Sequence, residues 1–307
     1  MFPKAMALGY TDPLYILAFD HRGSFSKGLF GIEGEPSAAQ LEQVIESKKV
    51  IWEGFQKAAA GTAGGPYGLL VDEQFGTDVA RGAKAAGFKF AMPVEKSGQP
   101  DFDFQYGDHF GVHIEEFDPT FSKVLVRYNP DGDAEMNERQ VQRLARLSDW
   151  LHDNDRKFLF ELLVPAEPAQ LEQAGGDQHT YDVEIRPDLV VRTIAECQAA
   201  GIEADIWKIE GLDRREDCVR VAEQARAGGR DGVACIVLGR GADFDTVANW
   251  LEVGAGVPGY TGFAVGRTIW WDALKGWIAD QLSREQATTT IAERYSSMVE
   301  TFSAAAG

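Results

Sequence analysis

Residues 204–211 read ADIWKIEG, a short apolar run in which Lys208 and Glu210 interrupt the hydrophobic positions. Successive side chains of a β-strand point to opposite faces, so Ile206, Lys208 and Glu210 share one face. Charged side chains are costly to bury unless they are paired or have a chemical function. The stretch therefore predicts a buried strand whose inner face carries charge at its C-terminal end.

Runs of the same kind recur along the chain and alternate with longer segments of helical period. The apolar runs cover residues 15–19, 68–71, 88–92, 124–127, 158–164, 205–209, 233–238 and 260–265; the helical segments lie near residues 38–60, 78–86, 137–153, 186–200, 213–228, 242–253, 267–281 and 284–303. Strands that alternate with helices predict an α/β fold with a parallel sheet. An open doubly wound sheet also fits, but eight regular units favour a (β/α)8 TIM barrel, folded as a single domain over residues 1–307.

The charge balance excludes several classes of partner. The chain has 30 basic and 48 acidic residues, a formal net charge of −18. Such a chain is repelled by nucleic acid and by anionic membranes, so we expect neither as a partner. No stretch approaches the ~18 consecutive apolar residues of a membrane span. An anionic substrate must then be held by a local group of basic side chains.

Cysteine use and the N-terminal residues bear on the compartment. The chain has three cysteines, none of them in a CxxC pair: Cys197, Cys218 and Cys235. An odd number without such pairs gives no disulfide framework and predicts a reducing cytoplasm. The N-terminus contains Pro3 and Lys4 and no long apolar run, so we predict no signal peptide. We also expect a homo-oligomer.

Alternation along the strand candidates brings further charges to one place. The sets that share a face are Ile16, Ala18, Asp20 and Arg22; Lys123, Leu125 and Arg127; Leu159 and Glu161; Ile206, Lys208 and Glu210; and Thr261, Phe263, Val265 and Arg267. Functional groups of a parallel barrel lie at the C-terminal ends of its strands. A set of structural ion pairs that close the barrel is the alternative to a catalytic site. If these faces point inward, the charged residues at the barrel mouth are Asp20, Arg22, Glu161, Lys208 and Arg267.

Lys208 is the most informative of these residues. Burial disfavours the charged form of an amine, which makes a buried lysine available as a nucleophile. A neutral amine attacks a ketone to form an imine, and the imine stabilises the carbanion that carbon–carbon cleavage requires. Glu161 lies on the neighbouring strand candidate, where it is within reach as a general acid/base. The alternative is a structural ion pair of Lys208 with Glu161 or Glu210.

Two glycine-containing turns predict a phosphate site. Gly239, Arg240 and Gly241 follow the run 233–238, and Gly266 and Arg267 follow the run 260–265. Glycine lets backbone amides approach an anion closely, and the loops after the last two strands of such barrels often bind phosphate. The alternative is that these are ordinary turns at helix starts.

The histidines give a weaker signal. His109 and His113 have the i,i+4 spacing of a metal pair on a helix, next to Asp108. Their surroundings, residues 99–117, are typical of a loop, as are residues 165–180, and we predict no metal and no other cofactor. His21 follows Asp20 directly and is expected to line the mouth as a structural residue.

Four segments carry a resemblance to a known family. They are LAFDHRGSF at 17–25, LVDEQFG at 70–76, WKIEG at 207–211 and GFAVGRTIWW at 262–271. Over nearly its whole length the chain resembles the aldolase domain fused C-terminally to some 5-dehydro-2-deoxygluconokinases of myo-inositol catabolism. More distantly it is similar to the class I tagatose-bisphosphate and sulfofructose-phosphate aldolases, which are (β/α)8 barrels with a Schiff base on the sixth strand.

The resemblance implies roles for the matching positions. Lys208 matches the imine lysine, Glu161 the acid/base of the fifth strand, and Lys123 lies near a lysine that contacts substrate. Asp20 and Arg22 match an Asp-x-Arg pair that orients substrate hydroxyls or proton transfers. The dipeptide at residues 266–267 matches the Gly-Arg of the phosphate site.

The expected reaction is the cleavage of 2-deoxy-5-keto-gluconate 6-phosphate to dihydroxyacetone phosphate and malonate semialdehyde, with a phosphorylated sugar acid as the substrate. Arg22 or Lys123 is expected to hold its carboxylate. An aldolase for another ketose phosphate and a non-catalytic sugar-phosphate-binding barrel are the alternatives.

Overall fold

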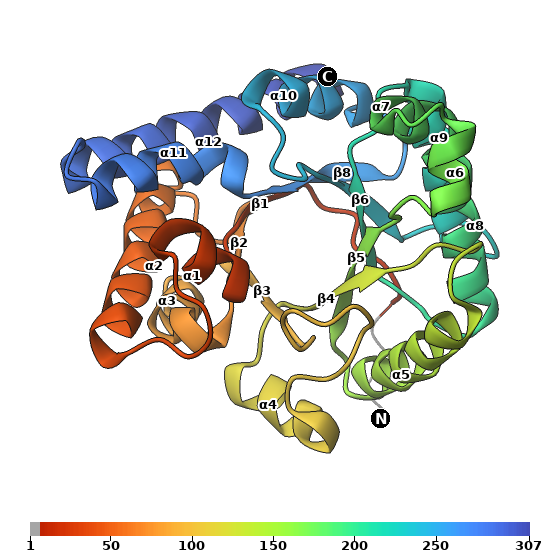
Figure 1. The fold of residues 1–307 in the computed structure, drawn as a ribbon, viewed down its shortest axis with the longest axis horizontal. Helices are drawn as coiled ribbons and strands as arrows, with labels where there is room; N and C mark the ends of the chain where they lie inside the picture. Colours follow the sequence, from red (N-terminus) through yellow and green to blue (C-terminus); the bar gives the residue numbers. More distant parts are fainter. Residues whose placement is uncertain (1–6) are drawn as a thin grey trace.

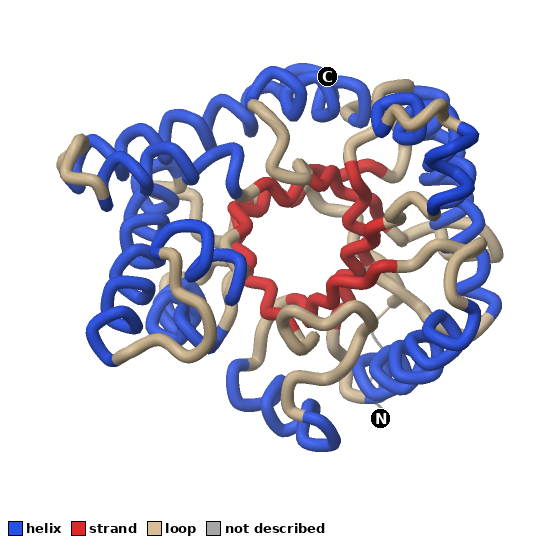
Figure 2. The backbone as a smooth tube through the Cα atoms, viewed as in Figure 1, coloured by secondary structure: helices blue, strands red, loops and turns tan. Residues whose placement is uncertain are grey.

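The computed structural model describes residues 7–307 and shows eight parallel strands closed into a barrel (Figures 1 and 2). The strands are Leu14–Ala18 (β1), Tyr67–Leu70 (β2), Lys89–Pro93 (β3), Phe121–Arg127 (β4), Lys157–Leu163 (β5), Ile206–Glu210 (β6), Ala234–Leu238 (β7) and Tyr260–Val265 (β8). Each strand pairs with the next, and β1 pairs with β8. The predicted single-domain (β/α)8 barrel is confirmed. Pro3 and Lys4, on which the expectation of no signal peptide partly rests, lie outside the described residues.

Helices surround the barrel, and most begin near the predicted positions (Figure 2). They are Gly23–Phe30 (α1), Ala38–Ala58 (α2), Glu73–Ala85 (α3), Phe110–Phe117 (α4), Ala134–Asp153 (α5), Pro168–Gln173 (α6), Gln178–Thr180 (α7), Arg186–Ala199 (α8), Arg215–Ala225 (α9), Phe244–Gly254 (α10), Arg267–Ile278 (α11) and Arg284–Ala306 (α12), with the 3-10 turn Gly107–His109 (η1) and the π-helical turn Tyr181–Ile185 (η2). Ser37 and Ser283 start α2 and α12 with capping boxes, which satisfy free amides of the first turn.

Both segments predicted as loops contain helices. Residues 99–117 include α4, whose Phe110, Ile114 and Phe117 are buried against the core. Residues 165–180 include α6, which has Pro168 in its first turn and a capping box made by Glu167. Both helices are short, so tertiary packing and local capping stabilise them more than any long periodic pattern.

The hydrophobic core has two layers. Small and branched aliphatic side chains and one phenylalanine fill the inside of the barrel: Leu14, Ile16, Ala18, Leu70, Ala91, Phe121, Leu159, Ile206, Ala234, Ile236 and Ala264. A larger layer packs between the strands and the surrounding helices. The inner layer includes the predicted inward residues of β1, β5 and β6, so the charged residues that continue those faces lie at the mouth of a filled barrel.

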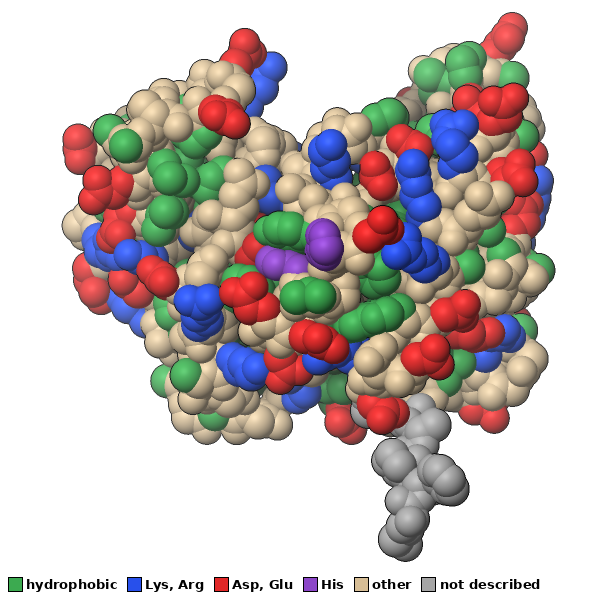
Figure 3. All heavy atoms as spheres, turned by 90° about the horizontal axis from the view of Figure 1, so that it is seen from below, with side chains coloured by type: hydrophobic (Ala, Val, Ile, Leu, Met, Phe, Trp, Pro, Cys, Tyr) green, Lys and Arg blue, Asp and Glu red, His purple; other side chains and the backbone are tan. Residues whose placement is uncertain are grey.

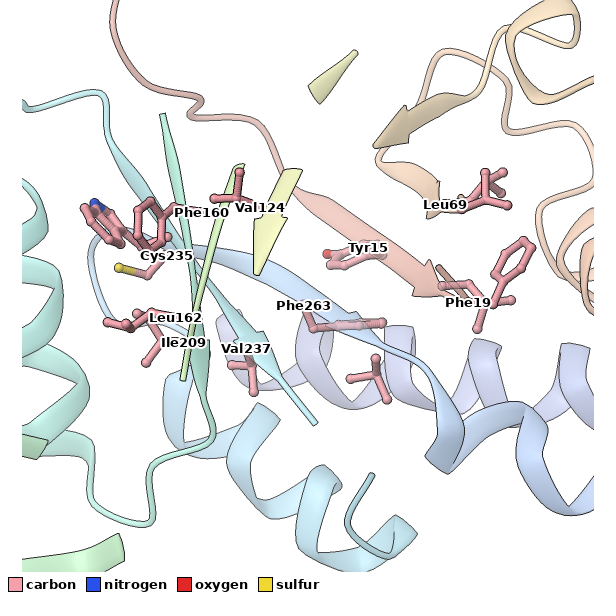
Figure 4. Packing of buried hydrophobic residues seen from close by; sticks show 14 of the residues in the cluster. Tyr15, Phe19, Leu69, Val124, Phe160, Leu162, Ile209, Cys235, Val237 and Phe263 are labelled. Carbon is pink, nitrogen blue, oxygen red and sulfur yellow. The ribbon is translucent and has the colours of Figure 1, made fainter. Parts of the chain in front are cut away.

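The predicted inward face of β8 is wrong. Phe263 lies in the outer layer, where its ring stacks on Tyr15 with centroids 5.4 Å apart (Figure 4). Ala264 faces the barrel interior instead. There is little space there: a Cβ added at Gly262 would lie 1.9 Å from the backbone oxygen of Leu14. Position 262 therefore accepts only glycine, and Phe263 packs in the layer between the strands and the helices.

Charge of both signs is spread over the surface. On the face seen from below Figure 1, acidic and basic side chains are interspersed (Figure 3). Among the described residues, no helix combines the length and the apolar character that crossing a membrane requires. Basic groups that serve a substrate must therefore be sought in a local cavity.

Candidate active site

A cavity of about 840 Å³ opens at the C-terminal ends of the strands. It is lined by residues of both segments that were predicted as loops, including Pro100 and Pro165. His21 lines it as well. Every residue predicted for the site lies in its wall: Asp20, Arg22, Lys123, Glu161, Lys208, Gly239, Arg240, Gly241, Gly266 and Arg267.

Lys208 and Glu161 face each other across β5 and β6, whose register places them side by side. Lys208 Nζ lies 2.9 Å from Glu161 Oε1, and the two residues are only 3% and 5% exposed. Burial by itself would raise the pKa of Glu161, but the charges of Lys123 and Lys208 outweigh it and hold that pKa below its usual value. Glu161 is therefore an ionised carboxylate at neutral pH, ready to accept a proton from the amine.

Lys123 on β4 is the centre of a cluster of carboxylates. Its Nζ lies 2.8 Å from Asp20 Oδ2, 2.9 Å from Glu95 Oε1 and 3.0 Å from Glu161 Oε2. Burial works against the charged amine, but the three carboxylates outweigh it and raise the pKa of Lys123. Burial likewise opposes the charge of Asp20, and Lys123 more than compensates, so the pKa of Asp20 is lowered. Lys123 therefore stays protonated and holds three acids around one point.

Glu95 is a member of this cluster that the sequence analysis missed. Burial raises its pKa, and Lys123 and Arg22 offset this only in part. Its Oε2 atom has no hydrogen-bond partner within the described residues. The signal was present: Ala91 faces the barrel interior, and a period of two continues that face to Glu95.

The loop after β1 is fixed from two sides. Arg22 Nη2 donates to the backbone oxygen of Glu95 at 2.7 Å and lies 3.4 Å from its carboxylate. Behind the loop, Lys48 of α2 donates to the backbone oxygens of Phe19 at 2.8 Å and His21 at 3.0 Å. Lys48 also forms a fully buried ion pair with Asp72, which caps α3. These contacts hold Asp20 and Arg22 at the mouth.

Within residues 7–307, the predicted phosphate turns contain one arginine that pairs with carboxylates and one that does not. Arg240 contacts Glu210 Oε1 at 3.1 Å and Asp182 Oδ2 at 2.7 Å. Arg267 donates to the backbone oxygen of Arg240 at 2.9 Å, and within residues 7–307 it forms no ion pair. Arg240 therefore supports the cavity wall, whereas the charge of Arg267 is available to an anion.

Glycine is required at two positions of these turns. Gly241 has φ +74°, and a Cβ there would lie 2.6 Å from the Arg267 guanidinium. At Gly266 a Cβ would lie 2.2 Å from the backbone oxygen of Ala18. Any larger residue would therefore displace Arg267 or push β8 away from β1.

The remaining histidines lie outside this cavity wall. His113 is in α4, where it stacks on Tyr106 and lies 3.6 Å from the carboxylate of Glu73. His109 ends the short turn η1. Among the described residues, no group of three or more His, Cys, Asp or Glu side chains is arranged to hold a metal ion.

The sequence matches a protein family and is similar to a curated aldolase. The family described as "Uncharacterized protein conserved in bacteria (DUF2090)" matches residues 5–306. The chain is 24% identical over 206 residues to tagatose 1,6-diphosphate aldolase 2 of Enterococcus faecalis, a match that covers 63% of this chain and 55% of that protein. The chain thus spans about half the length of this curated relative.

Two solved structures share the fold. A Corynebacterium glutamicum protein, Cgl0159, has a TM-score of 0.57 and 18% identity, covering 94% of this chain and 86% of its own. Fructose-bisphosphate aldolase of Plasmodium falciparum has a TM-score of 0.62 and 13% identity, covering 95% and 91%. At these identities the likeness concerns the architecture of the barrel.

Proposed function

We propose that this chain, which belongs to the DUF2090 family, is a Schiff-base (class I) aldolase that cleaves 2-deoxy-5-keto-gluconate 6-phosphate to dihydroxyacetone phosphate and malonate semialdehyde. The observation that carries the proposal is the contact of Lys208 Nζ with Glu161 Oε1, 2.9 Å long, in the wall of the cavity. A buried amine beside an ionised carboxylate is the pair that imine formation needs, because one group attacks and the other moves protons.

The first steps form the imine. Lys208 first gives a proton to Glu161, and its amine, now neutral, attacks the C5 ketone. Glu161 passes that proton to the carbonyl oxygen, which becomes the hydroxyl of a carbinolamine. Glu161, ionised again because Lys123 and Lys208 hold its pKa low, accepts a second proton from the same nitrogen. It returns that proton to the carbinolamine hydroxyl, which leaves as water, and an iminium ion remains.

Cleavage then uses the iminium as an electron sink. The C3 hydroxyl gives its proton to Asp20, whose carboxylate Lys123 holds ionised. The C3–C4 bonding electrons move toward the iminium nitrogen, malonate semialdehyde leaves, and an enamine remains on Lys208. Protonation at C4 and hydrolysis release dihydroxyacetone phosphate and regenerate the amine.

The phosphate is assigned to Arg267 and the turns that follow β7 and β8. Arg267 is free of carboxylates among the described residues, and its planar fork matches the oxygens of a phosphate. Gly239, Gly241 and Gly266 leave room for an anion to approach the backbone. This position lies two strands from Lys208, which suits a phosphate one carbon from the imine carbon.

A second candidate substrate is tagatose 1,6-diphosphate, which the 24% identity to the Enterococcus faecalis enzyme favours. Its C2 ketone would form the same imine with Lys208, and its C3–C4 bond would break in the same way. Turnover of each compound by the purified protein distinguishes the two.

Trapping with borohydride tests the mechanism. The protein is incubated with dihydroxyacetone phosphate or either sugar, reduced with borohydride, digested and analysed by mass spectrometry. We expect a stable adduct on the peptide that contains Lys208, and none in Lys208→Met. Turnover without an adduct would overturn the Schiff-base mechanism, and binding without adduct or turnover would indicate a sugar-phosphate-binding barrel.

A further inference from the structure

The basic side chains of the cavity fall into two classes. Seven line its wall: Arg22, Lys96, Lys123, Arg127, Lys208, Arg240 and Arg267. Four of them contact carboxylates, as described above for Arg22, Lys123, Lys208 and Arg240. Within residues 7–307, Lys96, Arg127 and Arg267 have no carboxylate partner. On a chain of net charge −18, three unpaired cations in one cavity mark where it accepts anions.

Two of these cations, Arg127 and Arg267, lie on opposite sides of the mouth. Arg127 is the last residue of β4, and Arg267 is the first residue of α11, directly after the β8 turn. In a closed ring of eight strands, β4 and β8 are opposite each other (Figure 1). Lys208 on β6 is two strands from each. A substrate bound to Lys208 therefore has Arg127 on one side and Arg267 on the other.

On the β4 side of the cavity, the acidic residues near Lys96 contact an arginine of α5. The backbone amide of Lys96 donates to the backbone oxygen of Asp103 at 2.8 Å, which fixes the backbone of Lys96. The carboxylates of Asp101 and Asp103 lie 3.3 Å and 3.8 Å from Arg143 of α5. Asp101 and Asp103 therefore pair with α5. Within residues 7–307 neither forms an ion pair with Lys96, which lines the cavity.

We propose that Arg127, assisted by Lys96, binds the second anionic group of the substrate, at the end farthest from the imine carbon. The inference rests on the proposed function and names its substrate class: an open-chain ketose with an anion at each end. The proximal phosphate is one carbon from the imine carbon and lies toward Arg267. The distal anion is several carbons away and lies toward Arg127, whose fork binds a carboxylate or a phosphate through two parallel hydrogen bonds.

This assignment replaces the expectation that Arg22 or Lys123 holds the sugar-acid carboxylate. Lys123 already contacts three carboxylates, and Arg22 is only 5% exposed and bound to Glu95. Each would have to break an existing buried ion pair to bind substrate, which is costly. Arg127 is exposed at the cavity wall and, among the described residues, has no ion pair to break when it binds.

A series of non-reacting hexose derivatives tests the proposal without imine chemistry. Glucitol 6-phosphate carries the proximal phosphate alone, 6-phosphogluconate adds a carboxylate, and glucitol 1,6-bisphosphate adds a phosphate. We expect calorimetry to show that the wild type binds one of the two compounds with an anion at each end about 10- to 100-fold more tightly than glucitol 6-phosphate. Preference for 6-phosphogluconate identifies a carboxylate as the distal group, and preference for the bisphosphate identifies a phosphate.

Arg127→Gln should abolish this preference and leave the affinity for glucitol 6-phosphate unchanged. Arg81→Gln is the matched control, because Arg81 pairs with Glu116 on the outer helices. Retention of the wild-type preference in Arg127→Gln, or no preference in the wild type, overturns the proposal. If the proposed function is wrong, no borohydride adduct forms with dihydroxyacetone phosphate. The binding series does not depend on the imine and still tests the role of Arg127.

Discussion

Glu95, which follows β3, contacts Lys123 of β4: Glu95 Oε1 lies 2.9 Å from Lys123 Nζ. Lys123 serves two further carboxylates, Asp20 and Glu161. One ammonium therefore contacts three acids. Burial raises the pKa of Glu95, and the charges of Lys123 and Arg22 offset this only in part. Lys123 is the residue that links the three acids to one another.

Lys123→Met should cost about 3–5 kcal/mol of unfolding free energy, because it leaves the buried carboxylate of Asp20 without its ion-pair partner and removes one partner each from Glu95 and Glu161. Glu95→Gln removes one of those charges, so the double variant should recover part of the loss. Chemical denaturation at neutral pH measures all three variants as a double-mutant cycle. Additive effects of the two substitutions would contradict a shared cluster.

Glu161→Gln should slow imine formation about 10²- to 10⁴-fold, the usual contribution of a positioned acid/base. The amide cannot accept the proton of Lys208, although it keeps the size of the carboxylate. Borohydride quenching at timed intervals with dihydroxyacetone phosphate measures the rate. Glu135→Gln, at an exposed position of α5, serves as the control and should match the wild type. An unchanged rate in Glu161→Gln would remove this residue from the mechanism.

The barrel and most of its mouth could be predicted because they follow from local patterns and one topological rule. The run around Lys208 shows a period of two, and closure of a parallel barrel brings all strand ends together. The contact between Lys208 and Glu161 then requires only that β5 and β6 be neighbours. This is why every predicted site residue lies in the cavity wall.

Other features cannot be predicted from the alternation of side chains along a strand. A period of two shows that Thr261, Phe263 and Val265 share a face, but packing in the closed barrel decides which face is inside, and here it is the face of Gly262 and Ala264. The pair of Lys48 with Asp72 joins a helix to a strand end across 24 residues. Such partners become neighbours only once the barrel closes, so the sequence shows no local sign of them.

Lys48→Met should destabilise the protein by about 3–5 kcal/mol, because Asp72 would remain as an uncompensated buried charge. The backbone oxygens of Phe19 and His21 would also lose their donor. Denaturant unfolding measures the change. Lys49→Met, at the next position and partly exposed, should stay within about 0.5 kcal/mol of the wild type. Equal stability of the two variants would show that the buried pair contributes little.

Arg267→Gln should raise the concentration of dihydroxyacetone phosphate needed for half-maximal trapping by about 10- to 100-fold, since a charge-assisted contact to phosphate is lost. The maximal yield of adduct should be retained because Lys208 is intact. Arg127→Gln should leave trapping of this short compound unchanged, which separates the two sides of the cavity. A normal concentration dependence in Arg267→Gln would exclude this arginine from the phosphate site.

His21 should make the folded state sensitive to acid. Burial lowers its pKa to about 4; Asp20 opposes that shift, while Arg267 and Lys48 add to it. In the unfolded chain a histidine has a pKa of about 6.5. Between these values the unfolded state binds a proton that the folded state does not, so stability falls as the pH drops from about 6.5 to 4. The loss from this one residue is on the order of 2–3 kcal/mol.

His21→Asn removes the titrating group, so its unfolding free energy should fall less steeply over the same pH range. Carboxylates such as Asp20 titrate in both proteins, and the difference between the two pH profiles isolates the histidine. His179→Asn, at an exposed position, should follow the wild-type profile. The absolute stability of His21→Asn also reflects its lost contact with Trp270, so the slope is the informative quantity. Parallel slopes for the wild type and His21→Asn would mean that His21 takes up its proton in the folded state as readily as in the unfolded chain.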